Sequence, residues 1–168
     1  MRLPPVFLGL GSNLGDRESA IEGALARLAA RGFRTTLRSS LWLTEPVGGP
    51  PQGFFLNAVA GGETALAPEA LLEACLATER EMGRVREERN GPRTIDVDIL
   101  FFGGERRDVP GLVIPHPRLH ERRFVLAPLA EIAPALVHPV LGLAVADLLD
   151  RCADRSAVAL HASREAQA

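Results

Sequence analysis

Hydrophobic and polar residues follow two different periods along this chain. Apolar runs that are continuous, or that alternate with polar residues, predict strands over residues 6–10, 33–43, 54–60 and 94–102. Apolar residues at helical spacing predict helices in four places: Asp16 to Gly32, Pro68 to Gly83, 127–132 and 145–149. The pattern therefore indicates a mixture of strands and helices.

The order of these elements predicts the fold. Two strand–helix–strand units follow one another, which is typical of a ferredoxin-like α+β sandwich. We expect a mostly antiparallel sheet with helices packed on one face and extra helices at the C-terminal end. At 168 residues the chain has the size of one domain. We therefore expect a single domain over 1–168, with a loosely held, polar and Ala-rich tail from about residue 156.

The strand predicted over 94–102 carries two carboxylates on one face. Its apolar parity consists of Ile95, Val97, Ile99 and Phe101. Asp96 and Asp98 then share the opposite face, because successive side chains of a strand point to opposite sides. Aspartate is rare in strands, and two at this spacing repel each other unless a cation lies between them. Leu100 and Phe102 continue the same parity, so this face is not simply solvated, and a metal site is favoured.

Arginines precede the carboxylate strand. A charged run from Arg84 to Asn90 lies between Gly83 and Gly91, and Arg93 follows. Such a run is usually a solvated loop, but a guanidinium also offers a two-pronged fork to phosphate oxygens. Hard Mg²⁺ prefers oxygen ligands and shares them with phosphates. A carboxylate pair beside arginines therefore predicts a site for a metal-bound polyphosphate.

A loop dense in proline and glycine, residues 44–53, precedes the third predicted strand. Its length indicates a functional lid. In the strand that follows, Phe55 and Asn57 share one face. This pair is compatible with a core position and a satisfied amide. It is equally compatible with a stacking surface beside a hydrogen-bonding group, which is what a flat heterocycle needs.

Composition narrows the function classes. The formal net charge is −2, all 19 basic residues are arginines, and they are scattered among acids, so we expect no nucleic-acid partner. The apolar run at residues 6–10 is too short for a signal peptide or a membrane span. Two cysteines without metal-ligand spacing are compatible with a reducing cytoplasm. We expect a cytoplasmic protein without a membrane partner, and a monomer.

Residues 91–100, Gly-Pro-Arg-Thr-Ile-Asp-Val-Asp-Ile-Leu, closely resemble the signature of the 6-hydroxymethyl-7,8-dihydropterin pyrophosphokinase family of the folate pathway. Other family-like segments run from Gly9 to about Pro139. The resemblance implies a ferredoxin-like fold. It also implies transfer of the β,γ-pyrophosphoryl group of ATP to the hydroxymethyl oxygen of the pterin, with attack at Pβ and release of AMP.

The resemblance further implies roles for single residues. Two Mg²⁺ ions would be held by Asp96 and Asp98, which act catalytically with Arg84 and Arg93. Residues matching the ATP side of the family site are Glu79, Arg84, Arg93, His116 and Arg122. Residues matching the pterin side are the two rings Phe55 and Phe124, with Asn57 and the main chain near Thr44 and Val47.

The chain departs from the family pattern at Asn90, where some members carry a tryptophan, and the surrounding loop is one residue shorter. Two other classes fit the carboxylate strand. A nucleotidyl transferase of the polymerase-palm type would release pyrophosphate rather than AMP. A non-catalytic ligand-binding module would carry Asp96 and Asp98 as surface residues only, and it would show no Mg²⁺-dependent nucleotide binding.

Overall fold

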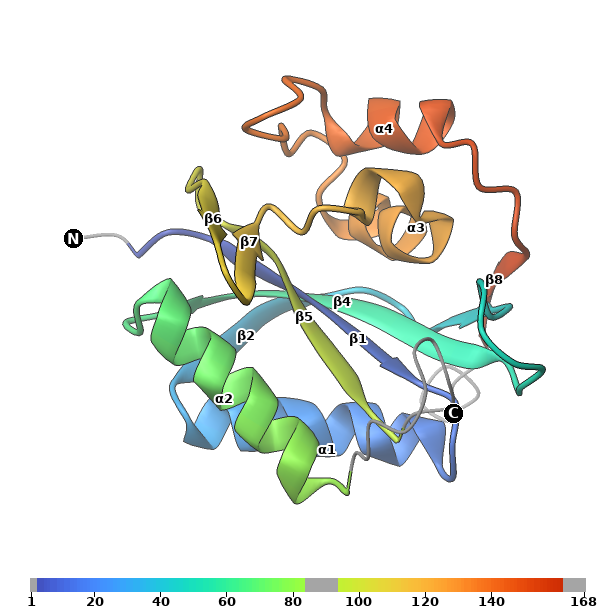
Figure 1. Cartoon of the computed structure of the whole chain (residues 1–168), viewed down its shortest axis with the longest axis horizontal. Coiled ribbons are helices and arrows are strands. Elements are labelled where there is room, and N and C mark those ends of the chain that lie inside the picture. Colours follow the sequence, from blue (N-terminus) through green and yellow to red (C-terminus); the bar gives the residue numbers. More distant parts are fainter. Residues whose placement is uncertain (1–2, 84–93, 162–168) are drawn as a thin grey trace.

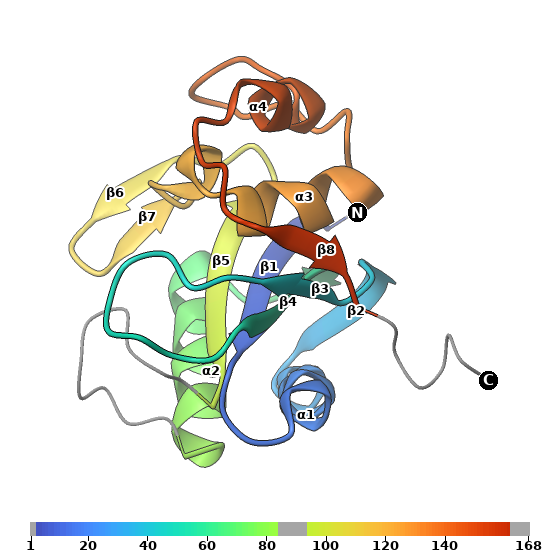
Figure 2. The ribbon, with the colours of Figure 1, turned by 90° about the vertical axis from the view of Figure 1, so that its right-hand side faces the viewer.

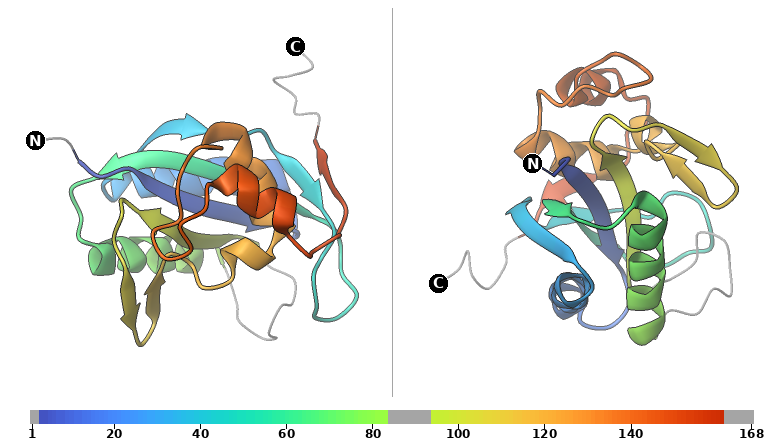
Figure 3. Two further views of the ribbon diagram at one scale, coloured as in Figure 1. Left: turned by 90° about the horizontal axis from the view of Figure 1, so that it is seen from above. Right: turned by 90° about the vertical axis from the view of Figure 1, so that its left-hand side faces the viewer.

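The computed structural model describes residues 3–83 and 94–161. Within these residues, a six-stranded antiparallel sheet has the strand order β5-β1-β4-β3-β8, and β2 pairs with the other end of β4 (Figure 1). The strands are β1 (Val6–Ser12), β2 (Phe33–Arg38), β3 (Trp42–Thr44), β4 (Phe55–Thr64), β5 (Asp96–Phe102) and β8 (Val158–Leu160). A separate hairpin of β6 (Arg107–Val109) and β7 (Leu112–Ile114) projects beyond the sheet (Figure 3).

Helices cover both faces of the sheet (Figure 1). α1 (Arg17–Ala30) and α2 (Pro68–Glu81) lie on one face. α3 (Arg123–Ile132), preceded by the 3₁₀ turn η1 (Leu119–Glu121), lies on the other face, with α4 (Val145–Arg151) beyond it. The units β1-α1-β2 and β4-α2-β5, with the short β3 between them, confirm the ferredoxin-like α+β arrangement with extra C-terminal helices. No helix among the described residues is long and apolar enough to cross a bilayer.

Local chemistry explains where the two long helices begin and end. The Asp16 side chain accepts a hydrogen bond from the Ser19 N–H at 3.1 Å, which caps α1 as expected. Gly32 follows α1 with φ +108°, a left-handed conformation that glycine adopts most readily. Pro68 occupies the first turn of α2, where its missing N–H costs nothing.

The stretch predicted as one strand over 33–43 is two strands, β2 and β3, separated by residues 39–41. The cause is a tertiary contact. The Ser39 hydroxyl accepts a hydrogen bond from the Val59 N–H at 2.9 Å, and the Ser39 N–H donates to the Val59 carbonyl at 2.9 Å. The Ser39 hydroxyl thus takes the place of a backbone acceptor in the ladder, and the strand is interrupted.

The parity predicted for β5 is correct as far as Leu100, and it is wrong for Phe101 and Phe102. Leu8 of β1 pairs with Ile99, whereas the preceding Phe7 pairs with Phe101, so β5 has one extra residue at this point. Such a bulge reverses the parity of the residues that follow. Phe101 therefore packs in the core beneath α3, and Phe102 in the core beneath α1 and α2.

The C-terminal part of the chain returns to the sheet as β8, which pairs with β3 (Figure 2). The ladder is extended at its end by a hydrogen bond from the His161 N–H to the Leu41 carbonyl at 2.9 Å. The tail expected to be loosely held from about residue 156 therefore contains a paired strand. Residues 162–168 lie outside the described part of the chain, and the single domain over 1–168 stays a prediction.

Candidate active site

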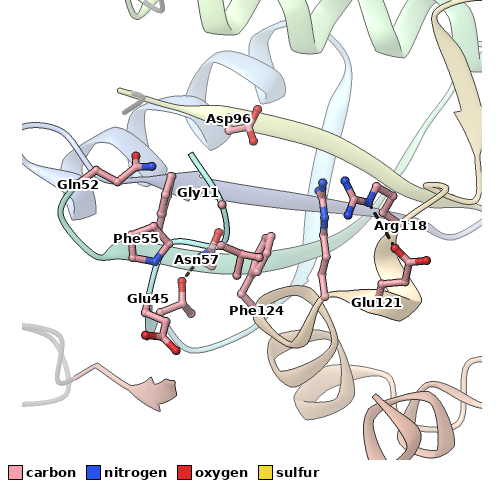
Figure 4. Close-up of a pocket in the computed structure, with 14 residues that line it drawn as sticks. Gly11, Glu45, Gln52, Phe55, Asn57, Asp96, Arg118, Glu121 and Phe124 are labelled. Atoms are coloured by element: carbon pink, nitrogen blue, oxygen red, sulfur yellow. Dashed lines mark hydrogen bonds and ion pairs between the residues drawn. The ribbon is translucent and has the colours of Figure 1, made fainter. Parts of the chain in front are cut away.

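A cavity of ≈ 200 Å³ opens on the face of the sheet that α3 covers (Figure 4). Its walls come from segments that are far apart in the sequence: the strands β1, β3, β4 and β5, the loop after β3, η1 and the start of α3. The described lining residues are Gly11, Thr44, Glu45, Pro46, Val47, Gly48, Gln52, Phe55, Asn57, Asp96, Arg118, Glu121, Arg122 and Phe124. All five residues predicted for the pterin side line this cavity.

Two phenylalanine rings lie on either side of an amide. Figure 4 shows Phe55 from β4 and Phe124 from α3 flanking Asn57. Asn57 is 9% exposed, and its Nδ2 donates to the hydroxyl of the buried Thr44 at 2.7 Å. Because Thr44 fixes the amide, its orientation is set before any ligand arrives. Two rings with a fixed amide between their edges suit a flat, polar heterocycle.

Gly11 makes room for that amide. A Cβ atom at Gly11 would lie 2.4 Å from the Asn57 Oδ1 and 3.6 Å from a carbon of the Phe55 ring. A side chain is therefore excluded at this position while Asn57 keeps its place. The local sequence does not indicate this role, because it depends on the pairing of Gly11 with Asn57 across β1 and β4.

Asp96 and Asp98 lie on β5, on the face of the sheet where the cavity opens. Asp96 lines the cavity, and Asp98 follows on the same side of the strand; both are half-buried. Their partners across the ladder are Gly11 and Gly9, which carry no side chains. Two carboxylates on one face of a strand, the first of them at a cavity wall, fit a hard divalent cation such as Mg²⁺. Among the described residues, no group of three or more metal-ligating side chains occurs.

Glu79 lies behind β5 and does not line the cavity. It projects from α2, is 3% exposed, and its Oε2 accepts a hydrogen bond from the Val97 N–H at 2.8 Å. Val97 lies between the two aspartates in the sequence. The contact therefore holds the segment of β5 that presents both carboxylates. The expected contact of Glu79 with the nucleotide stays a prediction.

Arg122 lines the cavity, whereas His116 lines a neighbouring one beside the β6–β7 hairpin. The Arg122 guanidinium carbon lies 5.6 Å from the centre of the Phe124 ring, within cation–π distance. Burial, together with the positive charge of Arg122, lowers the pKa of His116 from 6.5 to about 4. His116 Nδ1 accepts from the Arg118 N–H at 3.2 Å, so the neutral ring carries its proton on Nε2 at pH 7.

The loop over 44–53, predicted to be functional, supplies a large part of the cavity wall, although its action as a lid stays a prediction. Gln52 is held by a hydrogen bond from Asn13 at 2.8 Å, and Asn13 also donates to the Gly53 carbonyl at 3.1 Å. The lining residues that sequence reasoning missed on η1 and just before it are Arg118 and Glu121, which form an ion pair at 3.4 Å. The predicted arginines, Arg84 and Arg93, lie outside the described residues.

Comparison with known proteins identifies the family. A family model described as 7,8-dihydro-6-hydroxymethylpterin-pyrophosphokinase (HPPK) matches residues 7–134. The 2-amino-4-hydroxy-6-hydroxymethyldihydropteridine pyrophosphokinase of Methylorubrum extorquens is 50% identical over 132 residues, which are 78% of this chain and 84% of that protein. The enzyme of the same name from Bacillus subtilis is 48% identical over 127 residues, 75% of this chain and 76% of that protein.

A solved structure has the same fold. The Plasmodium falciparum HPPK-DHPS, crystallised with pterin, superimposes with a TM-score of 0.69 over 89% of this chain at 16% sequence identity. This chain spans 44% of that longer protein. The resemblance seen in residues 91–100 is thus confirmed over most of the sequence, and the chain belongs to the 7,8-dihydro-6-hydroxymethylpterin-pyrophosphokinase family.

Proposed function

We propose that this chain catalyses the Mg²⁺-dependent transfer of the pyrophosphoryl group of ATP to 6-hydroxymethyl-7,8-dihydropterin, a step of folate biosynthesis, with the pterin diphosphate and AMP as products. One observation carries the proposal. The cavity in which Phe55 and Phe124 flank Asn57 is the same cavity that Asp96 lines. A site for a flat heterocycle therefore adjoins a site for a metal-bound phosphate chain. Membership of the family supports the same reaction.

The pterin would lie between the two rings. Stacking on both faces of a flat molecule adds about 0.5–1.5 kcal/mol per ring pair beyond the burial of area. The Asn57 amide, held by Thr44, would read the polar edge of the heterocycle together with main-chain groups near Thr44 and Val47. This placement directs the hydroxymethyl arm toward Asp96 and the start of β5.

Asp96 and Asp98 would hold two Mg²⁺ ions. When bound, the ions neutralise phosphate oxygens and organise the phosphate chain. On the protein side, the ATP phosphates would be bound by Arg84, Arg93 and Arg122. Neutral His116 would offer its Nε2–H as a hydrogen-bond donor, and Glu79 would lie near the nucleotide. The pterin hydroxyl oxygen would form a bond to Pβ while the bond between Pβ and the oxygen that bridges it to Pα breaks. That oxygen leaves with Pα as AMP, and the hydroxyl proton passes to water.

No described residue of the cavity is placed as a dedicated general base. Phosphoryl transfer depends mainly on positioning and on neutralisation of charge, and the residues above provide both. We further propose that the protein works in the cytoplasm as a monomer, without nucleic-acid or membrane partners.

The nucleotide product tests the reaction. Incubation with ATP, Mg²⁺ and 6-hydroxymethyl-7,8-dihydropterin should yield AMP and pterin diphosphate in equal amounts, measured by ion-exchange chromatography. ADP would indicate transfer of the γ-phosphate alone. Pyrophosphate as the stoichiometric product would indicate a nucleotidyl transferase. A folded protein that gives no turnover would indicate a binding module.

A matched pair of variants ties that product to the carboxylates. Asp98→Asn should keep the fold and lose nearly all AMP formation, because an amide oxygen is a poor substitute for a carboxylate on Mg²⁺. Asp150→Asn, on the exposed side of α4, should retain the parent rate. Parent-like turnover by Asp98→Asn would refute the metal assignment.

A further inference from the structure

The segment from Asp154 to His161 contacts two walls of the cavity. It leaves α4, passes the start of α3, and then runs beside β3 as β8 (Figure 2). These residues lie beyond residue 134, where the family match ends. The roles carried over from the family therefore do not include them.

The first attachment is at the start of α3. The Asp154 Oδ2 accepts a hydrogen bond from the Arg123 N–H at 3.1 Å, and its Oδ1 accepts from the Ser156 N–H at 2.9 Å. The Ser156 hydroxyl also donates to Oδ1. Arg122, the residue at the N-cap position of α3, makes no side-chain cap. Asp154 therefore supplies the cap from a distant part of the chain, directly beside Phe124.

These bonds also favour the charged form of Asp154. Burial alone raises the pKa of this carboxyl, but the hydrogen bonds from Ser156 and Arg123 outweigh it and hold the pKa below its ordinary value. The cap is therefore a carboxylate at neutral pH. A negative charge at a helix N-terminus is also favoured by the helix dipole.

The second attachment is at the loop after β3. The Glu45 N–H donates to the Ala157 carbonyl at 3.1 Å, and the Ala157 N–H donates to the Glu45 Oε1 at 2.7 Å. Glu45 lines the cavity, so the C-terminal segment fixes one of its carboxylate oxygens. Beyond this point Val158 pairs with Thr44, and the His161 ring bonds the Glu18 carboxylate at 2.9 Å.

The two attachments are three residues apart, which limits how far the walls can separate. Three residues of extended chain span at most about 11 Å. Two rings that hold a flat molecule between them are about 7–8 Å apart, twice the usual carbon–carbon contact distance. A short tether anchored at both ends therefore resists opening of the gap between α3 and the loop after β3.

We propose that Asp154 is a positioning residue which, through the tether it begins, holds Phe124 and the Glu45 loop at the separation that the heterocycle requires. The proposal rests on the proposed function, because it names the pterin as the molecule in the gap. The C-terminal segment then contributes to pterin binding and takes no part in the transfer step.

Two substitutions of Asp154 test this. Asp154→Ala removes both acceptor oxygens, whereas Asp154→Asn keeps a carbonyl oxygen and is as good a helix cap. We expect Asp154→Ala to raise the Kd and KM for the pterin by about three- to thirty-fold, the range that corresponds to loss of a helix cap. The KM for ATP and kcat should stay within two-fold. Asp154→Asn keeps an acceptor for the Arg123 N–H and loses the one for the Ser156 N–H, so it should weaken pterin binding less than Asp154→Ala does. Asp150→Ala should match the parent.

Several results would overturn the proposal. They are equal losses of ATP and pterin affinity, a loss of pterin affinity in Asp154→Asn as large as in Asp154→Ala, and a lower Tm for Asp154→Ala with unchanged pterin Kd. If Asp154→Ala does not fold, Ser156→Ala replaces it, since it removes only one bond to the carboxylate. It should weaken pterin binding in the same direction by a smaller factor, and unchanged binding contradicts the tether.

Amide hydrogen exchange separates this proposal from the proposed function. In the unliganded protein, Asp154→Ala should speed the exchange of amides 123–126 and of the Glu45 amide, with little change in α1 and α2. That result supports the tether whatever substrate the cavity takes. Unchanged exchange at both attachments refutes the tether even if the parent enzyme forms AMP.

Discussion

At the scale of single residues, the cavity depends as much on a missing side chain as on those present. Asn57 can face the space between the rings only because Gly11, opposite it on β1, has no Cβ. Gly9 lies two residues earlier on the same face, where a Cβ would meet only the tip of Leu100 at 3.4 Å. The two glycines therefore look alike in sequence and differ in what surrounds them.

This difference makes a testable pair. Gly11→Ala should displace the Asn57 amide, break its 2.7 Å bond to Thr44 and weaken pterin binding by at least tenfold, a loss of about 1.4 kcal/mol. Gly9→Ala should bind the pterin nearly as the parent does, because the Leu100 side chain can shift. Calorimetric titration of both variants measures the difference, and equal affinities would show that the amide does not contact the ligand.

At the scale of elements, α2 supports β5 through one buried carboxylate. β5 is the edge of the described sheet, and Glu79 bonds the Val97 N–H there. The helix thus stabilises the strand at the residue between the two aspartates. A backbone donor that lost this acceptor would stay buried and unpaired, at a cost of about 1–3 kcal/mol.

Glu79→Ala should therefore lower the free energy of unfolding by about that amount, whereas Glu79→Gln, which keeps an acceptor oxygen, should lose less. Glu73→Ala, at an exposed position of the same helix, should change it by no more than about 0.5 kcal/mol. Urea denaturation followed by circular dichroism measures all three variants. An unfolding free energy for Glu79→Ala equal to that of Glu73→Ala would exclude a supporting role.

At the scale of the whole molecule, the fold brings together two rings that belong to different layers. Phe55 stands on the sheet and Phe124 on the helix that covers it. Phe54, the neighbour of Phe55, is 44% exposed and does not line the cavity. It offers a control of the same residue type one position away.

We expect Phe55→Ala and Phe124→Ala each to weaken pterin binding at least several-fold, with little change in ATP affinity, because a stacked aromatic pair contributes about 0.5–1.5 kcal/mol beyond its burial. Phe54→Ala should leave both affinities unchanged. Equilibrium binding of the pterin and of an ATP analogue, measured separately, tests the assignment. Parallel losses for the two ligands would mean that the rings serve the core.

The periodicity of apolar residues was sufficient to predict most helices and strands, since these depend mainly on local sequence. It failed where a distant contact decides the local structure. Ser39 breaks a strand by bonding Val59, and the bulge that redirects Phe101 exists only because β5 pairs with β1. The strand β8 has only three residues, too few to show a period, and it forms on the edge of β3.

The candidate site likewise contains some residues that the local sequence indicates and others that it does not. Asp96 and Asp98 stand out in the sequence because carboxylates at strand spacing repel each other, and Asn57 because it shares a face with a ring. Phe124 came only from the family resemblance, since nothing in its neighbourhood marks it. Gly11 and the cap at the start of α3 depend on pairings between distant segments, which no local pattern records.

The position of β1 between β4 and β5 has a consequence for folding during synthesis. This apolar strand is translated well before its two neighbours in the sheet, β4 (Phe55–Thr64) and β5 (Asp96–Phe102). Pairings between such distant segments close slowly, and an unpaired apolar strand is prone to stick to other chains. Until residues 96–102 have been synthesised, β1 lacks one of its two neighbours in the sheet. We expect chaperones that cover exposed apolar strands to reduce aggregation most in that interval.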